Sequence, residues 1–547
     1  MQNKSILSIQ NLSISFRQGK EWNPVIKGVS LEVPQGGILG VVGESGSGKT
    51  VSSLACMGLL PSKIARIDHG VALFGASQED LLQDNFTHAK RYRGKEITMI
   101  FQEPMSSLNP SMTCGAQVAE MLKEHLGMDA KKARQRTVEL FTEVELPVPV
   151  DMFDRYPHEL SGGQKQRVMI AMALAPEPSL IIADEPTTAL DVTVQKSVLE
   201  LLRRLQQARQ LSMIFISHDL GVVAHVADQV AVMYKGEVLE SGPVTQVMQN
   251  PTQAYTKGLL ACVPPTNGER VRLQTVEEII KGGEVKKEIY SSSPSKDPIL
   301  RVKDLWKRFV TRRNLLGKAT DHFDAVRGVS FELFQGETLG IVGESGCGKS
   351  TVSRMIIGLI EPSEGSIEWS GSAGAVQLVF QDPYSSLNPR ISVGNALVEA
   401  MMVNGVESDR QKAQDQVRSI LAEVGLDPSH FDRYPHSFSG GQRQRIVVAR
   451  ALCTNPRVVV LDESVAALDV SVQAQVLNLL NQLKASRGLT YVFISHDLHV
   501  VHYMSDRLLV MERGQIVESG NAHKIFTQPS EEYTKKLVES AVFTNEG

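Results

Sequence analysis

The stretch that decides the fold is "GESGSGKT", Gly43 to Thr50, in a chain of 547 residues. It follows the apolar run "GGILGVVG" and precedes a helical pattern, which is the setting of a glycine-rich loop that cradles phosphate. Glycines let backbone N–H groups converge on phosphate oxygens because no Cβ obstructs the approach. The following helix offers its positive N-terminal end to the anion. Lys49 supplies a charge for the terminal phosphates, and Thr50 supplies a hydroxyl for Mg²⁺.

The same loop occurs a second time, as "GESGCGKS", Gly343 to Ser350, 300 residues after the first. Four further segments recur at offsets of 278 or 279 residues: "IFQEPMSSLNP" (100–110) with "VFQDPYSSLNP" (379–389), "RYPHELSGGQKQR" (155–167) with "RYPHSFSGGQRQR" (433–445), "LIIADEP" with "VVVLDES", and "IFISHDL" with "VFISHDL". The one large change of offset, from 300 to 279 residues, places a surface insertion in the first copy, around residues 66–96. A unit written twice predicts two similar domains.

The repeat also sets the expected domain boundaries. The two copies end alike, in "NPTQAYTKGLLACVP" (250–264) and "QPSEEYTKKLVESAV" (528–542). The polar segment 265–297 between the copies has Pro, Gly and Ser at both ends, and we interpret it as a linker with a short helix in its middle. We therefore expect a first domain over 1–264 and a second over 298–547.

Within each copy, apolar runs rich in β-branched residues alternate with longer helical patterns, which indicates an α/β fold. Runs such as "SLIIAD" and "SMIFISH" are apolar without alternation. They predict strands buried on both faces of a mostly parallel sheet that is covered by helices. Polar residues stand just after each run, where open α/β sheets bind ligands beyond the carboxyl ends of their strands.

Two adjacent carboxylates follow one of these runs in each copy. We interpret Asp184 and Asp462 as residues that hold Mg²⁺, directly or through water. Glu185 and Glu463 fit the base that polarises water for attack on the γ-phosphate. A helix-capping acid would explain one aspartate, but not paired acids that recur at a matched spacing.

A histidine follows another apolar run in each copy, at His218 and His496. In this setting each histidine is expected to contact the γ-phosphate and hold the attacking water. Gln102 and Gln381 are expected to sense the same phosphate and the metal, because an amide both donates and accepts hydrogen bonds.

The segments "LSGGQ" (160–164) and "FSGGQ" (438–442) begin with a serine that fits a helix N-cap. Two glycines just inside a helix are costly unless something approaches closely, and an anion at the helix end would explain them. Each copy already has its own phosphate loop. The second anion-contacting element makes sense if it serves the nucleotide held by the other copy.

Composition excludes several classes of protein. The net charge of −4 gives no basic field, so we expect no nucleic-acid partner. The five cysteines form no CxxC pair and are expected to be free thiols in a reducing cytosol. The N-terminus lacks a signal-peptide layout, and no apolar run approaches the ~18 residues of a membrane span. Work at a membrane would therefore be done through partners.

Together these motifs resemble the ATP-binding-cassette (ABC) ATPases over nearly the whole chain apart from the linker. The resemblance implies two tandem P-loop domains, each with a RecA-like mixed or parallel sheet core, an α-helical subdomain and a small antiparallel β subdomain. It implies ATP and Mg²⁺ as cofactors and head-to-tail pairing of the domains, so that each ATP lies between one phosphate loop and the other domain's "SGG" segment.

The expected ATP contacts are Gly43, Glu44, Ser45, Gly46, Ser47, Gly48, Lys49, Thr50, Ser439, Gly440 and Gly441 in one site, and Gly343, Glu344, Ser345, Gly346, Cys347, Gly348, Lys349, Ser350, Ser161, Gly162 and Gly163 in the other. The expected metal contacts are Thr50, Gln102, Asp184, Ser350, Gln381 and Asp462. Phe16 and Phe309 fall where the family has an adenine-stacking aromatic, although either fits plain core. The motifs of the two copies differ at a few positions, but none of these differences removes a predicted catalytic group. Both sites are therefore expected to be active.

The amino-acid sequences of the motifs are similar to those of the peptide, nickel and opine importers, above all to those of their fused ATPase subunits. This implies two membrane permeases, an extracytoplasmic solute-binding protein and a position on the cytoplasmic side of the bacterial inner membrane. Only Cys262 lies where many relatives carry four cysteines for an iron–sulfur cluster, so no cluster is expected. A tandem ABC protein acting on ribosomes or DNA and an exporter ATPase remain the alternatives, and the transported solute is open.

Overall fold

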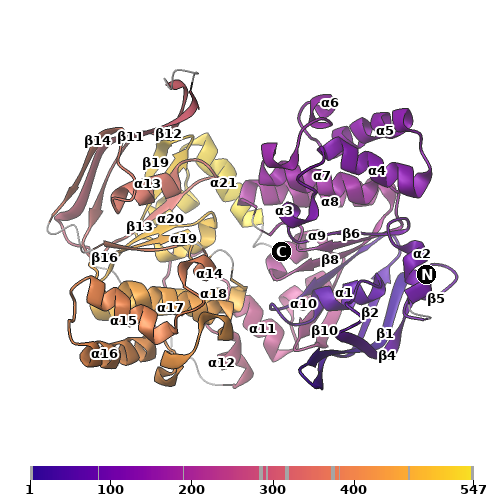
Figure 1. Ribbon diagram of the computed structural model, residues 1–547, viewed down its shortest axis with the longest axis horizontal. Coiled ribbons are helices and arrows are strands. Elements are labelled where there is room, and N and C mark those ends of the chain that lie inside the picture. Colours follow the sequence, from indigo (N-terminus) through magenta and orange to yellow (C-terminus); the bar gives the residue numbers. More distant parts are fainter. Residues whose placement is uncertain are drawn as a thin grey trace. The chain divides into compact units, whose positions relative to one another are not determined.

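The computed structural model describes residues 4–83, 86–188, 190–282, 288–290, 294–313, 319–370, 376–380, 382–465 and 468–543. The chain divides into two compact units, the first made of most of residues 1–260 and the second of most of residues 261–541. Each unit has the same kinds of layers, as the repeat predicts (Figure 1).

The centre of each unit is a six-stranded sheet, in the order β10-β9-β3-β8-β7-β6 in the first unit and β15-β16-β17-β13-β18-β19 in the second. All neighbours pair in parallel except the hairpins β9–β10 and β18–β19. Every residue of β3 (Ile38–Val42), β7 (Leu180–Asp184) and β8 (Ser212–Ser217) is buried. The unbroken apolar runs therefore form the doubly covered strands that were predicted from them.

The other strands of the first unit are β1 (Ser5–Gln18), β2 (Glu21–Pro34), β4 (Ala65–Phe74), β5 (Glu79–Asp80), β6 (Ile97–Ile100), β9 (Gln229–Tyr234) and β10 (Glu237–Pro243). Its helices are α1 (Lys49–Cys56), α2 (Thr87–Tyr92), α3 (Pro104–Ser107), α4 (Cys114–Leu126), α5 (Ala130–Glu143), α6 (Pro149–Met152), a 3₁₀ turn (Pro157–Glu159), α7 (Gly162–Leu174), α8 (Val192–Arg209), α9 (Leu220–Val226), α10 (Val244–Gln249) and α11 (Ala254–Ala261).

The strands of the second unit are β11 (Pro298–Arg313), β12 (Ala319–Phe334), β13 (Thr338–Val342), β14 (Glu364–Trp369), β15 (Val376–Val379), β16 (Val458–Asp462), β17 (Thr490–Ile494), β18 (Arg507–Glu512) and β19 (Gln515–Asn521). Its helices are α12 (Val276–Ile280), α13 (Lys349–Ile356), α14 (Pro383–Ser386), α15 (Val393–Val403), α16 (Arg410–Glu423), 3₁₀ turns (Pro428–Asp432 and Pro435–Ser437), α17 (Gly440–Leu452), α18 (Val470–Arg487), α19 (Leu498–Met504), α20 (Ala522–Thr527) and α21 (Glu532–Phe543).

Two smaller layers flank each central sheet. An antiparallel sheet, β2-β1-β4-β5 or β12-β11-β14, lies on one side, and a helical group, α4–α7 or α15–α17, lies on the other (Figure 1). The insertion expected in the first copy adds β5 and α2 beside β4. These layers match the core, helical subdomain and small β subdomain that the resemblance implied. Within the described ranges, no helix combines the length and the apolar character needed to cross a bilayer.

The segment interpreted as a linker makes contacts within the second unit. Asn478 on α18 accepts a hydrogen bond from the Leu273 N–H at 2.9 Å and donates to the Leu273 carbonyl at 2.8 Å. Arg270 forms a 2.8 Å ion pair with Asp506, and the Tyr503 hydroxyl donates to a carbonyl of the same segment. The short helix expected in its middle is α12. We call residues 270–282 the docked segment.

Candidate functional site

The loop Gly43–Thr50 joins β3 to α1, so it stands at the carboxyl end of a central strand, as predicted. Gly46 and Gly48 have φ of 80° and 101°, in the left-handed region that favours glycine. A Cβ at Gly43 would lie 2.1 Å from the Met233 carbonyl oxygen of β9. The loop therefore needs glycine for its backbone conformation and for its close approach to a neighbouring strand.

The loop lysine is held by its own loop. The Nζ of Lys49 donates to the carbonyl oxygens of Gly43 at 2.7 Å and Glu44 at 3.0 Å. In the second unit the Nζ of Lys349 makes the same two bonds at 2.6 and 2.9 Å. Both lysines are buried at the start of a helix, where a positive charge needs either carbonyl partners or an anion.

The loop hydroxyls meet the aspartates that end β7 and β16. Thr50 Oγ1 donates to Asp184 Oδ1 at 3.0 Å, and Ser350 Oγ donates to Asp462 Oδ1 at 3.1 Å. Burial raises the pKa of Asp184 to about 6, against the hydrogen bond from Thr50. Burial also raises the pKa of Asp462. A buried carboxylate beside a hydroxyl is an oxygen-donor pair suited to a hard cation.

Glu185 stands directly after Asp184, and three side chains converge on its Oε2. Gln102 Nε2 lies at 3.0 Å, Thr188 Oγ1 at 2.9 Å and His218 Nδ1 at 3.2 Å. Burial acts to raise the pKa of Glu185, but the hydrogen bond and charge of His218 outweigh it and hold that pKa below its usual value. The glutamate predicted as the base is thus kept ionised.

Backbone geometry fixes this glutamate in both units. Glu185 has φ of 46° and Glu463 has φ of 50°, which is uncommon for a residue other than glycine. Their N–H groups donate to the carbonyls of Ile216 (3.0 Å) and Ile494 (2.9 Å) at the ends of the neighbouring strands. A strained residue held by a sheet hydrogen bond is common at functional sites.

The second unit has a looser version of the same cluster. Nδ1 of His496 lies 3.7 Å from Oε2 of Glu463. This histidine holds the pKa of Glu463 below its usual value, against the effect of burial. Burial acts to lower the pKa of His496, but the carboxylate of Glu463 raises it overall. The predicted Gln381 lies outside the described residues.

The predicted N-caps are present. Ser161 and Gln164 form a reciprocal capping box at the start of α7, with bonds of 3.3 and 3.0 Å, and Ser439 and Gln442 form one at α17. Both serines are exposed.

The two glycines after each serine differ in surroundings. A Cβ at Gly163 would lie 2.5 Å from Val194, and one at Gly441 would lie 2.2 Å from Val472. By contrast, a Cβ at Gly440 would meet nothing within 4 Å. The second glycine of each pair is therefore required by helix packing. Of the two first glycines, Gly440 is open to an approaching group, whereas a Cβ at Gly162 would make an ordinary contact with Leu190 at 3.5 Å.

The two aromatic residues expected to stack on adenine differ in how exposed their rings are. Phe16 on β1 is partly buried against the core of the first unit. Phe309 on β11 is 39% exposed, with the Lys307 ammonium 5.4 Å from its ring centroid. The exposed ring of Phe309 is available for stacking, whereas Phe16 offers less of its surface.

Sequence reasoning missed two tyrosines that touch the phosphate loops. Tyr255 on α11 and Tyr533 on α21 each accept a hydrogen bond from a loop N–H. The signal was present, since both occupy the "YT" position at the end of their copy. It also missed Thr188, whose counterpart in the second copy is alanine.

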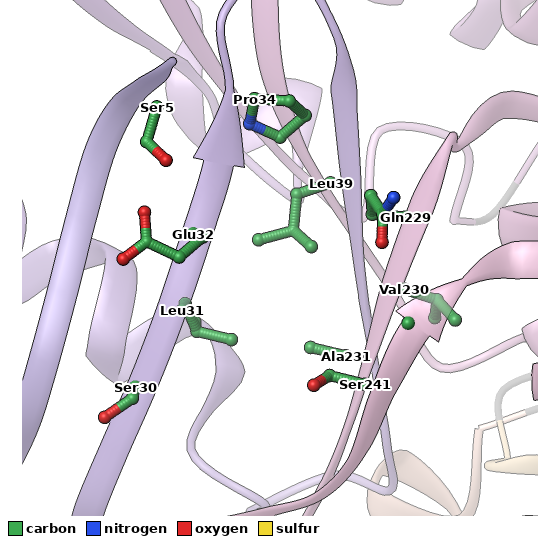
Figure 2. A pocket seen from close by; sticks show the side chains of 11 residues that line it. Ser5, Ser30, Leu31, Glu32, Pro34, Leu39, Gln229, Val230, Ala231 and Ser241 are labelled. Carbon is green, nitrogen blue, oxygen red and sulfur yellow. The ribbon is translucent and has the colours of Figure 1, made fainter. Parts of the chain in front are cut away.

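A separate pocket of about 410 Å³ opens between the β1–β2 layer and the β9–β10 hairpin of the first unit (Figure 2). Glu32 is the one charged side chain among its lining residues. None of the predicted nucleotide contacts lines it. We therefore place the candidate site at the phosphate loops and not in this pocket.

Comparisons with known proteins identify the family to which this chain is similar. The family model described as "ABC transporter" matches residues 26–188 and 326–466, and the model "Oligopeptide/dipeptide transporter, C-terminal region" matches 239–283. The glutathione import ATP-binding protein GsiA of Pectobacterium atrosepticum is 44% identical over 98% of this chain and 89% of its own length. GsiA of Escherichia coli K12 is 42% identical over the same shares.

Two solved structures share the tandem architecture. "RNase-L Inhibitor" covers 94% of this chain and 90% of its own, with a TM-score of 0.60 and 21% identity. The archaeal ribosome recycling factor aABCE1, solved with stalk protein aP1, covers 93% of this chain and 90% of its own, with a TM-score of 0.59 and 23% identity. At this level of identity the likeness shows the fold alone.

Proposed function

This chain belongs to the ATPase family of ABC transporters, and from that premise we propose that it powers uptake of short peptides or glutathione-like solutes through separate membrane permeases. The observation that supports this most is the 44% identity, over 98% of the chain, to a glutathione import ATP-binding protein. The match of residues 239–283 to the oligopeptide and dipeptide transporter region points to the same class of solute.

The loops fit the triphosphate of ATP. Each places left-handed glycines, a helix N-terminus and a buried lysine together. A Cβ at Gly46 or Gly346 would meet no neighbouring atom within 4 Å, so the loop is open at these positions. The lysines would exchange carbonyl partners within their loops for phosphate oxygens, a charge-assisted contact that is stronger than a neutral one.

The neighbouring residues fit Mg²⁺. Thr50 with Asp184, and Ser350 with Asp462, supply hydroxyl and carboxylate oxygens about 3 Å apart in a buried setting. The raised pKa values of both aspartates indicate buried negative charge that a cation would stabilise. When bound, Mg²⁺ supplies positive charge against the phosphate oxygens.

The residues around Glu185 fit the hydrolytic step. An ionised glutamate can accept a hydrogen bond from water and polarise it for attack on the γ-phosphate. Gln102 and His218 already contact Glu185 Oε2, so they are positioned to hold the same water and to report on the phosphate. Glu463 and His496 would do this in the second site.

We further propose that each ATP is completed by the "SGG" segment of the other domain. Ser161 and Ser439 are exposed N-caps, so their helix ends are free to receive phosphate. Ser439→Arg is then expected to abolish vanadate trapping of nucleotide at the loop containing Lys49. Ser161→Arg, the matched control, should act on the loop containing Lys349. The opposite assignment in peptide mapping would contradict the crossed pairing.

Transport partners follow from the importer class. The proposal includes two permeases that receive this subunit, a solute-binding protein outside the membrane, and a peripheral position on the cytoplasmic side of the inner membrane. Fractionation tests the position, because the chain should sediment with membranes and lose this behaviour when the permeases are deleted. Co-purification with ribosomes would overturn the transport function.

Uptake tests the solute. In a strain lacking the gene, we expect plasmid-borne wild type to restore uptake of labelled glutathione or a labelled dipeptide. A Glu185→Gln/Glu463→Gln variant should restore neither. Restored uptake of a nickel chelate or an opine, with neither peptide taken up, would contradict the peptide assignment.

A further inference from the structure

Each phosphate loop is tied to a helix that lies outside the central sheet. The Tyr255 hydroxyl on α11 accepts a hydrogen bond from the backbone N–H of Glu44 at 3.1 Å. In the second unit the Tyr533 hydroxyl on α21 accepts one from the N–H of Glu344 at 3.0 Å. Two copies that have diverged elsewhere thus make the same contact.

The helices that carry these tyrosines are anchored at their N-terminal ends. Glu240 on β10 accepts from the N–H groups of Thr252 at 2.7 Å and Gln253 at 3.3 Å. Glu518 on β19 accepts from Ser530 at 2.9 Å and from the next N–H at 3.2 Å. Burial works against ionisation of both glutamates, but the hydrogen bonds that each carboxylate accepts from side chains and backbone together hold its pKa below the usual value. A carboxylate at a helix N-terminus is stabilising. The helix that carries each tyrosine is therefore held in place at its N-terminal end.

The two tyrosines share the hydroxyl contact but not their packing. Tyr255 is 2% exposed and packs against Tyr234, with ring centroids 4.3 Å apart. The residue that corresponds to Tyr234 in the second copy is Glu512, and Tyr533 is only half-buried. A role in core packing alone does not explain why both copies retain the bond to the loop.

The hydrogen bond from the loop N–H to the tyrosine also affects the backbone carbonyls that hold the loop lysine. The tyrosine fixes the N–H of Glu44, and the carbonyls on either side of that amide, those of Gly43 and Glu44, are the acceptors of the Lys49 ammonium. The corresponding carbonyls of the second loop accept from Lys349. Fixing one peptide group therefore fixes the lysine and the start of the phosphate cradle.

We propose that Tyr255 and Tyr533 are positioning residues that pre-organise the two phosphate loops for ATP. The proposal rests on the assignment of these loops as ATP sites. A loop held in its binding conformation loses less conformational freedom when ligand binds. Removing the hydroxyl should therefore weaken ATP binding more than it slows the hydrolytic step.

The test uses the full chain with Tyr255→Phe and Tyr533→Phe, singly and together. Each change is expected to raise the KM for MgATP at its own site about fivefold, or ~1 kcal/mol at 1.4 kcal/mol per tenfold. The kcat should stay within about twofold of wild type. Binding is measured separately by MgATP titration in the Glu185→Gln/Glu463→Gln background.

Tyr491→Phe is the matched control. It also removes a buried tyrosine hydroxyl of the second unit, one that donates to the Leu480 carbonyl at 2.9 Å and not to the loop. It should lower the melting temperature without changing the KM for ATP. Unchanged KM in both loop variants, or an equal rise in Tyr491→Phe, would overturn the proposal.

Lys49→Ala and Lys349→Ala in the same titrations check the loops themselves. Lost ATP binding supports the loop assignment on which the proposal rests. Binding equal to wild type would overturn the assignment and the proposal together, whereas lost binding with unaffected tyrosine variants would overturn the proposal alone.

Discussion

At the residue scale, two acidic residues that are adjacent in sequence have pKa values shifted in opposite directions. Asp184 is the last residue of β7 and buried, so its pKa is raised. Glu185 turns away with a positive φ and meets His218, which holds its pKa down. One carboxylate is thereby suited to a cation and the other to polarising water.

Replacing the glutamates tests the proposal that they act as bases. Glu185→Gln and Glu463→Gln each should lower ATP turnover at least twofold, and the double variant about a hundredfold or more, because an amide cannot accept a proton. Steady-state phosphate release measures this. Glu200→Gln on the exposed side of α8 is the control and should behave like wild type. Nearly full turnover in either single variant would show that its site is not catalytic.

The raised pKa of Asp184 predicts a pH effect on metal-dependent binding. Below the folded pKa of about 6 the carboxyl is protonated and no longer a cation ligand. The apparent affinity for Mg²⁺ in the presence of ATP should fall up to tenfold per pH unit below about 6. Binding of ATP without Mg²⁺ over the same range is the control, and an equal loss there would contradict this explanation.

The raised pKa of Asp184 also predicts how the free energy of unfolding changes with pH. Between about pH 4 and pH 6 the folded protein binds more protons at Asp184 than the unfolded chain, whose aspartates titrate near 3.9. This group therefore lowers the free energy of unfolding as pH rises through that window. Added Mg²⁺ should reverse the loss.

At the element scale, α7 and α17 each begin with two adjacent glycines, and the two glycines of a pair are needed for different reasons. Ser439 caps α17, and the reciprocal bond with Gln442 confirms the cap that the sequence predicted. The anion explanation for both glycines was incomplete, because Gly441 is already required by contact with Val472 of α18. Gly440, the glycine beside it, has open space at its Cβ position.

This difference gives a matched pair of variants. Gly441→Ala should lower the free energy of unfolding by ~1–3 kcal/mol, since a methyl group there overlaps Val472. Gly440→Ala should leave the melting temperature unchanged or higher, because alanine is the better helix residue. If Gly440 faces ATP, its variant should still lose ATPase activity. Thermal unfolding and phosphate release separate the two effects, and equal destabilisation would contradict the packing argument.

At the scale of the whole molecule, the repeat predicted two similar units, and the docked segment makes them unequal. Asn478 is 5% exposed and bonds both backbone groups of Leu273. Its counterpart in the first copy is Glu200, which is exposed. The helices α8 and α18 therefore occupy equivalent places in sequence but have different surroundings.

The asparagine is expected to hold the docked segment in place. Asn478→Ala removes both hydrogen bonds, at ~1 kcal/mol each, so cleavage by trypsin after Lys281 should accelerate about tenfold or more. Asn404→Ala, at an exposed asparagine of the same unit, is the control. Mass spectrometry of the timed digest locates the cut. Equal cleavage rates in the two variants would contradict this role.

The sequence by itself determined the repeat, the strand–loop–helix setting of Gly43–Thr50 and the identity of the paired acids, because these depend on local pattern. Tertiary structure decided that Tyr255 reaches Glu44, that Gly441 meets Val472 and that Asn478 binds Leu273. These contacts join residues from 31 to 211 positions apart. No local periodicity specifies such a distance, since it is fixed only when sheet, helices and docked segment pack together.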